Sequence, residues 1–239
     1  GFEEFALEAD GWMHIPRGWY FMHGSKFPFL RSMAIQEGRS RGHPLPAGTR
    51  VGSHIQFGVS RPGLVVPPGQ PQFIADMVMG AQRTTIGGVA TAPTRAGKTL
   101  CSIEAACRLG LSTLVLVDRD PLMRQWVQAV EGNVIDGDGR PVRCGIIRED
   151  RFDLPPEYPF VVGMLQTLHR RALDDDTRRA FGTVIMDECD IAPCSTALGV
   201  LRRFSAHYAL GLTATPDRKD GLGRAIGWLF GPPIAELKR

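Results

Sequence analysis

Residues 92–99, with the sequence APTRAGKT, decide the fold of this chain. They follow a short apolar run, Ile86–Ala90, and lead into Lys98–Leu109, where apolar residues recur at helical spacing before a glycine. A loop of this composition between a strand and a helix presents backbone N–H groups and a helix N-terminus to phosphate oxygens. The stretch therefore predicts a phosphate-binding loop within a β-α unit.

The chain on both sides of this loop alternates between short apolar runs and segments with helical spacing. Residues 113–117 (TLVLV) are apolar on both faces, which is typical of a parallel strand covered by helices on two sides. Asp120 and Pro121 then supply a helix cap and a first-turn proline. Three further apolar runs follow, at residues 160–165, 183–186 and 207–212. This alternation predicts an α/β domain at residues 62–239, with a central parallel sheet flanked by helices.

Residues 1–61 have a different pattern. Glu3–Ile15 predicts two strands around a turn, and Val51–Val59 alternates apolar and polar residues as a strand does. Between them, residues 36–49 are polar and rich in glycine, proline and arginine, as exposed loops are. We therefore expect a small β-rich accessory region ahead of the α/β domain. Its aromatic residues suit base stacking or the core of the region itself, and we favour the core.

Composition narrows the class of protein. The net charge of +3 does not mark a nucleic-acid-binding protein, so any basic surface must be local. The five cysteines form no C-x-x-C pair, which indicates a reducing, intracellular compartment without disulfides or a zinc site. No apolar run reaches the roughly 18 residues of a membrane span, and no signal-peptide pattern is present. We expect a cytoplasmic protein of a prokaryotic or phage-infected cell that binds no membrane.

A second motif places two acids, Asp187 and Glu188, directly after the apolar run at residues 183–186. Ligands of open α/β sheets lie at the carboxyl ends of the strands, so Asp187 is expected to meet a Mg²⁺ ion that the Thr99 hydroxyl also binds. Glu188 is then placed to orient and deprotonate an attacking water, and Lys98 to bind the β- and γ-phosphates. Phosphoryl transfer needs a metal, a cationic clamp and a positioned water, and these residues supply all three, so the pattern predicts phosphoryl-transfer chemistry.

A third motif, GLTATP at residues 211–216, ends the last of the apolar runs. The hydroxyls of Thr213 and Thr215 flank one alanine, and both can form hydrogen bonds with the neighbouring acids. The same stretch also suits a simple exit from a strand, with Pro216 as the residue that ends it.

In this order and spacing, the three motifs resemble those of superfamily 2 helicases. The nearer resemblance is to the branch that contains XPB-type repair helicases, phage UvsW-type helicases and restriction-enzyme translocase subunits. Residues 114–126, which end in Gln-Trp, are similar to motif Ia of that branch, and residues 213–222 are close to its TATPxRxDGL form. The resemblance covers residues 62–237. It implies a RecA-like P-loop NTPase lobe that uses Mg²⁺ to hydrolyse ATP to ADP and phosphate. It also implies that this hydrolysis drives movement along nucleic acid or its unwinding, with DNA in preference to RNA.

The resemblance also implies roles for individual residues. The nucleotide contacts would be Gln70, Pro93, Thr94, Arg95, Ala96, Gly97, Lys98 and Thr99. Gln70 would contact adenine, although Gln72 is a rival by spacing. The residues that couple ATP binding to nucleic-acid binding would be Asp190, Thr213 and Thr215. The residues that contact the nucleic-acid backbone would be Arg119, Gln166, Thr167 and Arg170.

Two residues depart from the family pattern. Position 95 is arginine where most members have glycine, which lets such a loop turn freely. The Arg95 side chain could project toward the γ-phosphate or into solvent, and we favour solvent. Position 190 is aspartate where this branch usually has histidine. Asp190 can still accept a hydrogen bond from Thr213 or a nearby residue, so function is expected to survive.

The chain ends shortly after the third motif, and nothing in it can be a second RecA-like lobe. That lobe, in cis or in trans, supplies the arginine fingers of such motors, which are worth about 10³–10⁵ in rate in related NTPases. We therefore expect weak ATP hydrolysis from this lobe alone. An alternative function is a nucleotide-gated nucleic-acid-binding module with little turnover. A module without turnover does not need all four of the catalytic-site residues that this chain retains, which are Lys98, Thr99, Asp187 and Glu188. A metabolic P-loop kinase is disfavoured, because such kinases lack the Thr-Ala-Thr and Gln-Trp segments.

Overall fold

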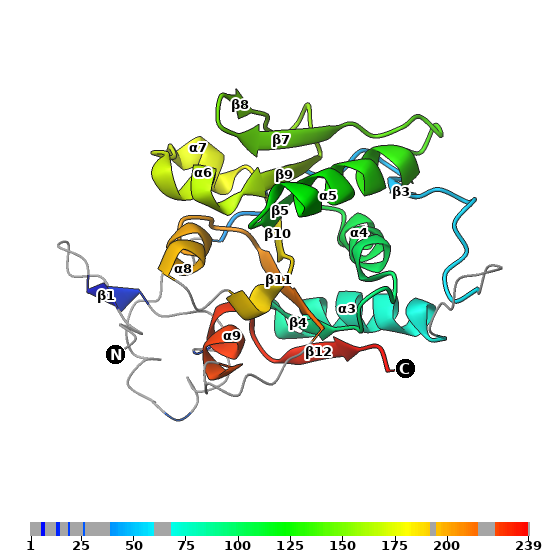
Figure 1. The fold of residues 1–239 in the computed structure, drawn as a ribbon, viewed down its shortest axis with the longest axis horizontal. Coiled ribbons are helices and arrows are strands. Elements are labelled where there is room, and N and C mark those ends of the chain that lie inside the picture. The colour runs from blue at the N-terminus through cyan, green and yellow to red at the C-terminus, as the bar shows by residue number, and fades with distance from the viewer. Residues whose placement is uncertain are drawn as a thin grey trace.

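An eight-stranded sheet forms the centre of the described part of the computed structural model (Figure 1). The structure describes residues 39–59, 68–191, 195–214 and 223–238, together with Ala6–Leu7, Met13–His14, Trp19 and Lys26. The strand order is β12-β4-β11-β10-β5-β9-β7-β8, in which only the β7–β8 pair is antiparallel. The strands are β4 (Gly87–Thr91), β5 (Thr113–Val117), β7 (Cys144–Arg148), β8 (Arg151–Phe152), β9 (Phe160–Met164), β10 (Thr183–Met186), β11 (Tyr208–Thr213) and β12 (Pro233–Glu236).

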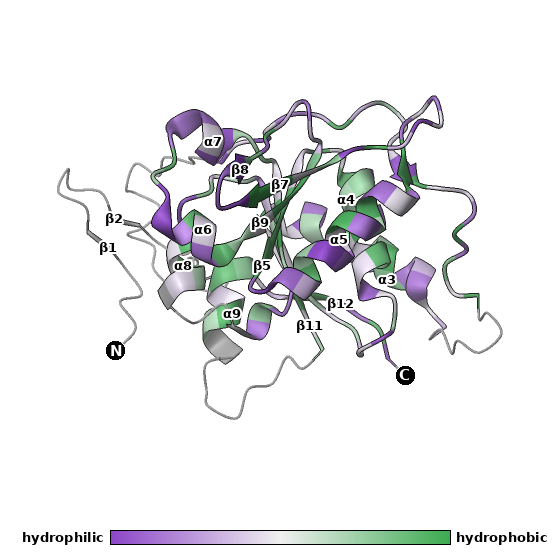
Figure 2. Ribbon diagram, turned by 45° about the horizontal axis from the view of Figure 1, so that its top comes forward, coloured by the Kyte–Doolittle hydropathy of each residue, from purple (hydrophilic) through white to green (hydrophobic). Residues whose placement is uncertain are grey.

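Helices cover both faces of this sheet. They are α3 (Gln70–Thr84), α4 (Lys98–Leu109), α5 (Asp120–Asn133), α6 (Leu165–Arg170), α7 (Asp175–Arg179), α8 (Ser195–Leu201) and α9 (Gly223–Phe230), with a short 3-10 helix, η2, at Cys189–Ile191. In Figure 2 the strands at the centre are largely apolar, whereas polar residues gather on α7 and on the outer side of α5. The prediction of an α/β fold with a central, largely parallel sheet is confirmed.

Alternation along the strands divides the apolar interior into two cores. Val115 and Val117 of β5 pack in one core with residues of α3, α4 and α5, such as Trp126. Leu114 and Leu116 point the other way, into a core shared with α6, α8 and α9. Successive side chains of a strand face opposite sides of a sheet, so a strand buried on both faces must be apolar throughout. This explains why residues 113–117 carry no charged residue.

The segment ahead of the α/β domain is described in part. Ala6–Leu7 (β1) and Met13–His14 (β2) pair antiparallel, as the expected hairpin requires. The strand expected at Val51–Val59 is wrong. Only Val51 of this stretch lies in a strand, β3 (Arg50–Val51), which pairs with β6 (Val134–Ile135), and turns follow at residues 53–54 and 57–58. Gly52 starts the first turn, since its carbonyl accepts a hydrogen bond from the Ile55 N–H at 3.0 Å.

The boundary expected between residues 61 and 62 lies outside the described residues and stays a prediction. The described stretch 39–59 packs along the α/β core. The Leu45 N–H donates to the Gly110 carbonyl at 3.0 Å, and the Gly52 N–H donates to the Asn133 carbonyl at 2.7 Å. Among the described residues, no helix combines the length and apolar character that crossing a membrane requires.

The parallel strands bring the motifs to one edge of the sheet. β11 lies between β4 and β10, and β5 follows on the far side of β10. The phosphate-loop sequence therefore leaves β4 beside Thr213, at the end of β11, and near Asp187, which follows β10. A hydrogen bond of 3.1 Å from the Ala92 N–H to the Thr213 carbonyl joins the loop to β11. The carboxyl edge of the sheet is thus the place where the predicted site residues meet.

Candidate ATP- and magnesium-binding site

Residues 92–97 form the loop between β4 and α4, as predicted. The loop turns tightly, with the Ala96 N–H donating to the Pro93 carbonyl at 3.2 Å, and Gly97 adopts a left-handed conformation (φ 82°) where the helix begins. The left-handed conformation favours glycine at position 97, and a Cβ there would also lie 2.5 Å from Nε2 of Gln70 and displace that side chain. The first N–H groups of α4 remain available to an anion, as in other helix N-termini that bind phosphate.

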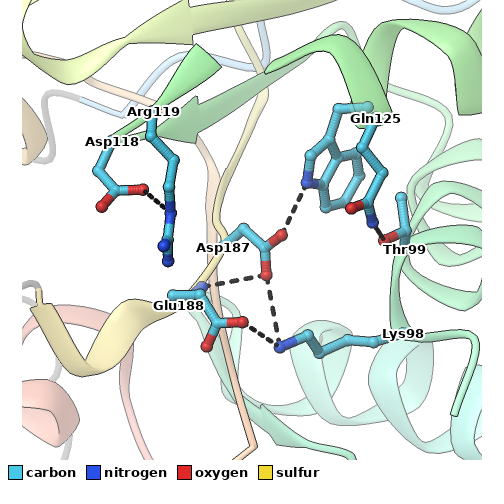
Figure 3. A network of polar contacts seen from close by, with 8 residues as sticks. Lys98, Thr99, Asp118, Arg119, Gln125, Asp187 and Glu188 are labelled. Carbon is cyan, nitrogen blue, oxygen red and sulfur yellow. Dashed lines mark hydrogen bonds and ion pairs between the residues drawn. The ribbon is translucent and has the colours of Figure 1, made fainter. Parts of the chain in front are cut away.

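Lys98 projects from the start of α4 toward the two acids that follow β10 (Figure 3). Its Nζ lies 3.5 Å from Oδ1 of Asp187 and 3.3 Å from Oε1 of Glu188. Asp187 is buried, with 4% of its surface exposed, whereas the Glu188 side chain is 31% exposed. A buried carboxylate requires a compensating charge or hydrogen bonds, and Lys98 supplies the charge. The two acids and the lysine therefore form one electrostatic unit.

Glu188 has a backbone conformation that non-glycine residues seldom adopt. Its φ is 51°, in the left-handed region, and its N–H donates to Oδ1 of Asp187 at 3.0 Å. Such conformations cost about 1–3 kcal/mol and concentrate at functional sites. The turn holds the Glu188 carboxylate near the loop, at a more exposed position than Asp187.

Two adjacent residues of α5 contact the site from a third direction (Figure 3). Nε2 of Gln125 donates to the Thr99 hydroxyl at 3.0 Å. The indole N–H of Trp126, a fully buried residue, donates to Oδ2 of Asp187 at 2.8 Å. Sequence reasoning noted the Gln-Trp segment but assigned neither residue a role. The Gln-Trp segment could have indicated such a role. A tryptophan on the apolar face of a helix carries an indole N–H that packing does not require and that needs an acceptor when buried.

The oxygen donors at this edge of the sheet fit a Mg²⁺ ion. Mg²⁺ is bound in proteins through one or two carboxylates together with substrate phosphates. The Thr99 hydroxyl and the Asp187 carboxylate are the two predicted ligands, and both are held by hydrogen bonds from α5. The ammonium group of Lys98 lies beside them and supplies a positive charge that can bind the phosphate oxygens.

Two buried cysteine thiols next to the site are poor nucleophiles. Burial raises the pKa of the Cys101 thiol on α4 to about 12. Burial also raises the pKa of the Cys189 thiol, which follows Glu188, far above its usual range. A thiol with a raised pKa stays protonated at neutral pH and is a poor nucleophile. Phosphate chemistry at this site therefore falls to oxygen and nitrogen groups.

Gln70 lies at the first residue of α3, under the phosphate loop. Its Nε2 donates to the Ala96 carbonyl at 2.7 Å, and its Oε1 accepts from the Gly58 N–H at 2.7 Å. Gln72, the rival by spacing, is exposed and donates to Asp76 at 2.7 Å. Of the two glutamines, Gln70 is thus the one that contacts the loop; a contact with adenine stays a prediction.

The residues expected to couple ATP to nucleic acid are described in part. Thr213 is buried at the end of β11, next to the phosphate loop, and Asp190 lies in η2, half-buried, two residues after Glu188. Thr215 lies outside the described residues. Their placement beside the site is compatible with coupling, which stays a prediction.

Arg95 is the residue of the loop that most needs explanation. Its φ is 64°, a conformation that costs a residue with a side chain about 1–2 kcal/mol relative to the right-handed one. Its side chain is exposed, as favoured from the sequence. This is the position where glycine would turn without strain.

Replacing Arg95 with glycine is expected to raise the free energy of unfolding by about 1 kcal/mol, since relief of the left-handed strain exceeds the added entropy of an unfolded glycine. Urea denaturation measures this change. Arg95→Ala is the control, because it removes the charge and keeps the strained conformation. Equal stability of the glycine and alanine variants would show that the backbone of residue 95 is not strained.

The four residues expected to contact nucleic acid fall into two groups. Gln166, Thr167 and Arg170 lie together on α6, whereas Arg119 follows β5 and pairs with the Asp118 carboxylate at 3.3 Å. Two of the α6 residues also have partners: Nε2 of Gln166 donates to the Asp118 carbonyl at 2.9 Å, and the Thr167 hydroxyl accepts from the Glu149 N–H at 3.3 Å.

An open cavity of about 290 Å³ adjoins α6, next to the start of α5. It is lined by Asp120, Arg148, Glu149, Met164, Gln166, Thr167 and Arg170. Arg148 pairs with Asp120 at 3.0 Å, which joins the end of β7 to the start of α5. The three α6 residues thus share one surface depression, at the same edge of the sheet as the candidate ATP site.

Comparison with known proteins places these features in a family. A family model described as "Type III restriction enzyme, res subunit" matches residues 64–218. The General transcription and DNA repair factor IIH helicase/translocase subunit XPB/SSL2 of Saccharomyces cerevisiae is 27% identical over 187 residues, which cover 74% of this chain and 22% of that protein. The chain therefore spans under a quarter of the length of this curated relative.

Solved structures share the fold. The UvsW helicase of bacteriophage T4 matches with a TM-score of 0.59 at 17% identity, over 96% of this chain and 81% of that one. The SWI2/SNF2 ATPase core of Sulfolobus solfataricus in complex with dsDNA matches with a TM-score of 0.54 at 18% identity, over 73% and 38%. Since the family model covers more than half of the sequence, the chain belongs to the family of Type III restriction enzyme res subunits, and its fold is that of a RecA-like helicase lobe.

Proposed function

We propose that this chain is the N-terminal ATP-binding half of an ATP-dependent superfamily 2 helicase or translocase that acts on nucleic acid, DNA in preference to RNA. One observation carries the proposal: the Lys98 ammonium group lies within 3.5 Å of both the Asp187 and the Glu188 carboxylates, beside a phosphate-binding loop. These groups come from two separate β-α units. A chance cluster of surface charges would not be expected to include a buried carboxylate.

Each group has a distinct task in ATP hydrolysis. The loop N–H groups and Lys98 bind the phosphates, and Lys98 offsets the negative charge that develops on them. Thr99 and Asp187 would hold Mg²⁺, which when bound polarises the phosphate oxygens. Glu188, the more exposed of the two acids, orients a water and accepts its proton. The hydrogen bond from Gln70 to the Ala96 carbonyl connects α3 to the phosphate-binding loop and so holds the loop in position for the nucleotide.

The nucleic-acid contacts are proposed for the α6 surface. Gln166, Thr167 and Arg170 are at least partly exposed there, next to Arg148. Contacts of this kind address phosphate and sugar and do not discriminate between base sequences. The Sulfolobus relative of the same fold was solved with dsDNA, which favours DNA as the polymer.

A second RecA-like lobe, in cis or in trans, completes the proposed motor. Arginine fingers accelerate related NTPases by about 10³–10⁵. The lobe alone is therefore expected to bind Mg-ATP and to hydrolyse it slowly.

The proposed function is tested by measuring phosphate release from ATP with and without single- and double-stranded DNA and RNA. Stimulation by DNA above that by RNA is expected. Stimulation by RNA alone would reassign the polymer. Binding of Mg-ATP and DNA with no turnover under any condition would instead favour a nucleotide-gated binding module.

Replacing Arg170 with alanine is expected to weaken binding to every DNA sequence alike and to reduce the salt dependence, d log K/d log[salt], by about 1, because one phosphate contact is lost. Fluorescence anisotropy at several salt concentrations measures this slope. Arg140→Ala is the matched control, since Arg140 is exposed in the turn ahead of β7 and pairs with Asp138. An unchanged slope for Arg170→Ala, or an equal change for Arg140→Ala, would contradict a phosphate contact at α6.

A further inference from the structure

Helix α5 contacts both residues that the proposed function assigns to Mg²⁺. Gln125 donates to the Thr99 hydroxyl at 3.0 Å, and Trp126 donates to the Asp187 carboxylate at 2.8 Å. Thr99 belongs to α4 and Asp187 follows β10, so two neighbouring side chains of one helix connect the two halves of the metal site (Figure 3).

The Trp126 contact sets the orientation of a carboxylate. A buried indole N–H is a donor that needs an acceptor, and here the acceptor is Oδ2 of Asp187. The terminal torsion of an aspartate side chain is otherwise broad, so this bond selects one orientation. Oδ1 is then directed to the Glu188 N–H and to Lys98, on the phosphate side of the site.

The Gln125 contact orients the other predicted ligand. A hydroxyl oxygen has two lone pairs, and Nε2 of Gln125 occupies one of those on Thr99. The second lone pair remains for a metal. Packing alone does not explain this contact, because the Gln125 side chain is exposed and would lose little contact area if it pointed into solvent.

We propose that Gln125 and Trp126 are positioning residues for the Mg²⁺ ion, which hold the Thr99 hydroxyl and the Asp187 carboxylate in the orientation that binds the metal. This inference rests on the proposed function. It assigns a task to the exposed side chain of Gln125 and to the indole N–H of Trp126, neither of which core packing requires. Hydrogen-bond partners of metal ligands commonly contribute about 10- to 100-fold to metal affinity.

The test is the affinity for Mn²⁺, a paramagnetic substitute for Mg²⁺, measured by electron paramagnetic resonance on the 239-residue chain with a saturating non-hydrolysable ATP analogue. Trp126→Phe keeps the aromatic ring and removes the N–H, and it is expected to weaken metal binding about 10- to 100-fold. Gln125→Leu is expected to weaken it in the same direction. Binding of the analogue in EDTA should change much less in both variants, because the hydrogen bonds of the two residues go to the proposed metal ligands Thr99 and Asp187 and not to residues 92–98.

Phe181→Leu is the control for a general loss of packing, since Phe181 is fully buried and packs against Phe204 at a ring distance of 6.0 Å. Gln125→Leu changes an exposed residue, so it tests the proposal even if Trp126→Phe does not fold. Wild-type metal affinity in Gln125→Leu and in folded Trp126→Phe overturns the proposal. A loss that Phe181→Leu reproduces overturns it as well.

Asp187→Asn separates this inference from the proposed function. It should bind Mn²⁺ no better than Trp126→Phe does. If Asp187→Asn binds the metal like the wild type, the proposed magnesium site itself is wrong. A weak Asp187→Asn beside unaffected Trp126→Phe and Gln125→Leu overturns only the positioning role.

Discussion

Replacing Glu188 with glutamine is expected to lower ATP turnover by about 100-fold or more, because general-base catalysis contributes about 10²–10⁴ in rate. Glutamine keeps the size of the side chain and its hydrogen bonds but cannot accept the proton of the attacking water. Binding of Mg-ATP should remain, since Asp187 and Lys98 are unchanged. Single-turnover phosphate release and equilibrium nucleotide binding measure the two quantities separately.

Glu149→Gln is the matched control for this loss, because it removes an equal charge from an exposed side chain in the β7–β8 turn. Turnover of Glu149→Gln should stay close to that of the wild type. Normal turnover of Glu188→Gln would mean that another group activates the water, and the assignment of Glu188 would be incorrect.

Replacing Lys98 with alanine is expected to weaken ATP binding by about 10- to 100-fold, since a hydrogen bond to a charged group is worth about 1.5–3 kcal/mol. The change also leaves Asp187, which is buried, without the ammonium group 3.5 Å from it. Thermal stability should therefore fall in the same variant. Isothermal calorimetry and thermal denaturation measure the two effects.

Arg108→Ala is the control for Lys98→Ala, because it removes the same charge from an exposed side chain at the other end of α4. Its ATP affinity should change much less. Equal losses in the two variants would show that general positive charge, and not the position of the ammonium group, attracts the phosphates.

Much of the fold could be predicted because local patterns and tertiary structure agree. The run at residues 113–117 is apolar on both faces, and β5 is buried on both faces. The strand expected at Val51–Val59 fails for a local reason. Its alternation of apolar and polar residues is interrupted by Gly52 and by Gly58, which has a φ of 80°, and the backbone turns at both ends of the stretch.

The candidate site was predictable where residues follow strand ends. Lys98, Asp187 and Glu188 each stand directly after a β-strand or its loop, so the rule for open α/β sheets brings them together. That rule does not apply to Gln125 and Trp126, because they lie within a helix and not at the end of a strand. The position of this helix beside the site depends on its packing against β5 and β9. Helical spacing alone identifies Trp126 as a core residue, and its hydrogen bond becomes apparent only in three dimensions.

Surface contacts were the least predictable part. The α6 residues were selected from resemblance, and the structure shows that the Thr167 hydroxyl accepts a hydrogen bond from the β7–β8 turn. That turn lies 18 residues away along the chain, and no local pattern links it to α6. Exposed polar side chains can give up such internal hydrogen bonds and bind a ligand instead. A sequence pattern does not show which of the two contacts a side chain makes.

The most direct test of the account is the binding of ATP to the wild-type chain, measured by calorimetry with Mg²⁺ and with EDTA. The account predicts one nucleotide per chain, with Mg²⁺ increasing the affinity and with the increase lost in Asp187→Asn. No binding, or binding of equal strength with and without Mg²⁺, would contradict the assignment of Thr99 and Asp187 as metal ligands beside a phosphate-binding loop.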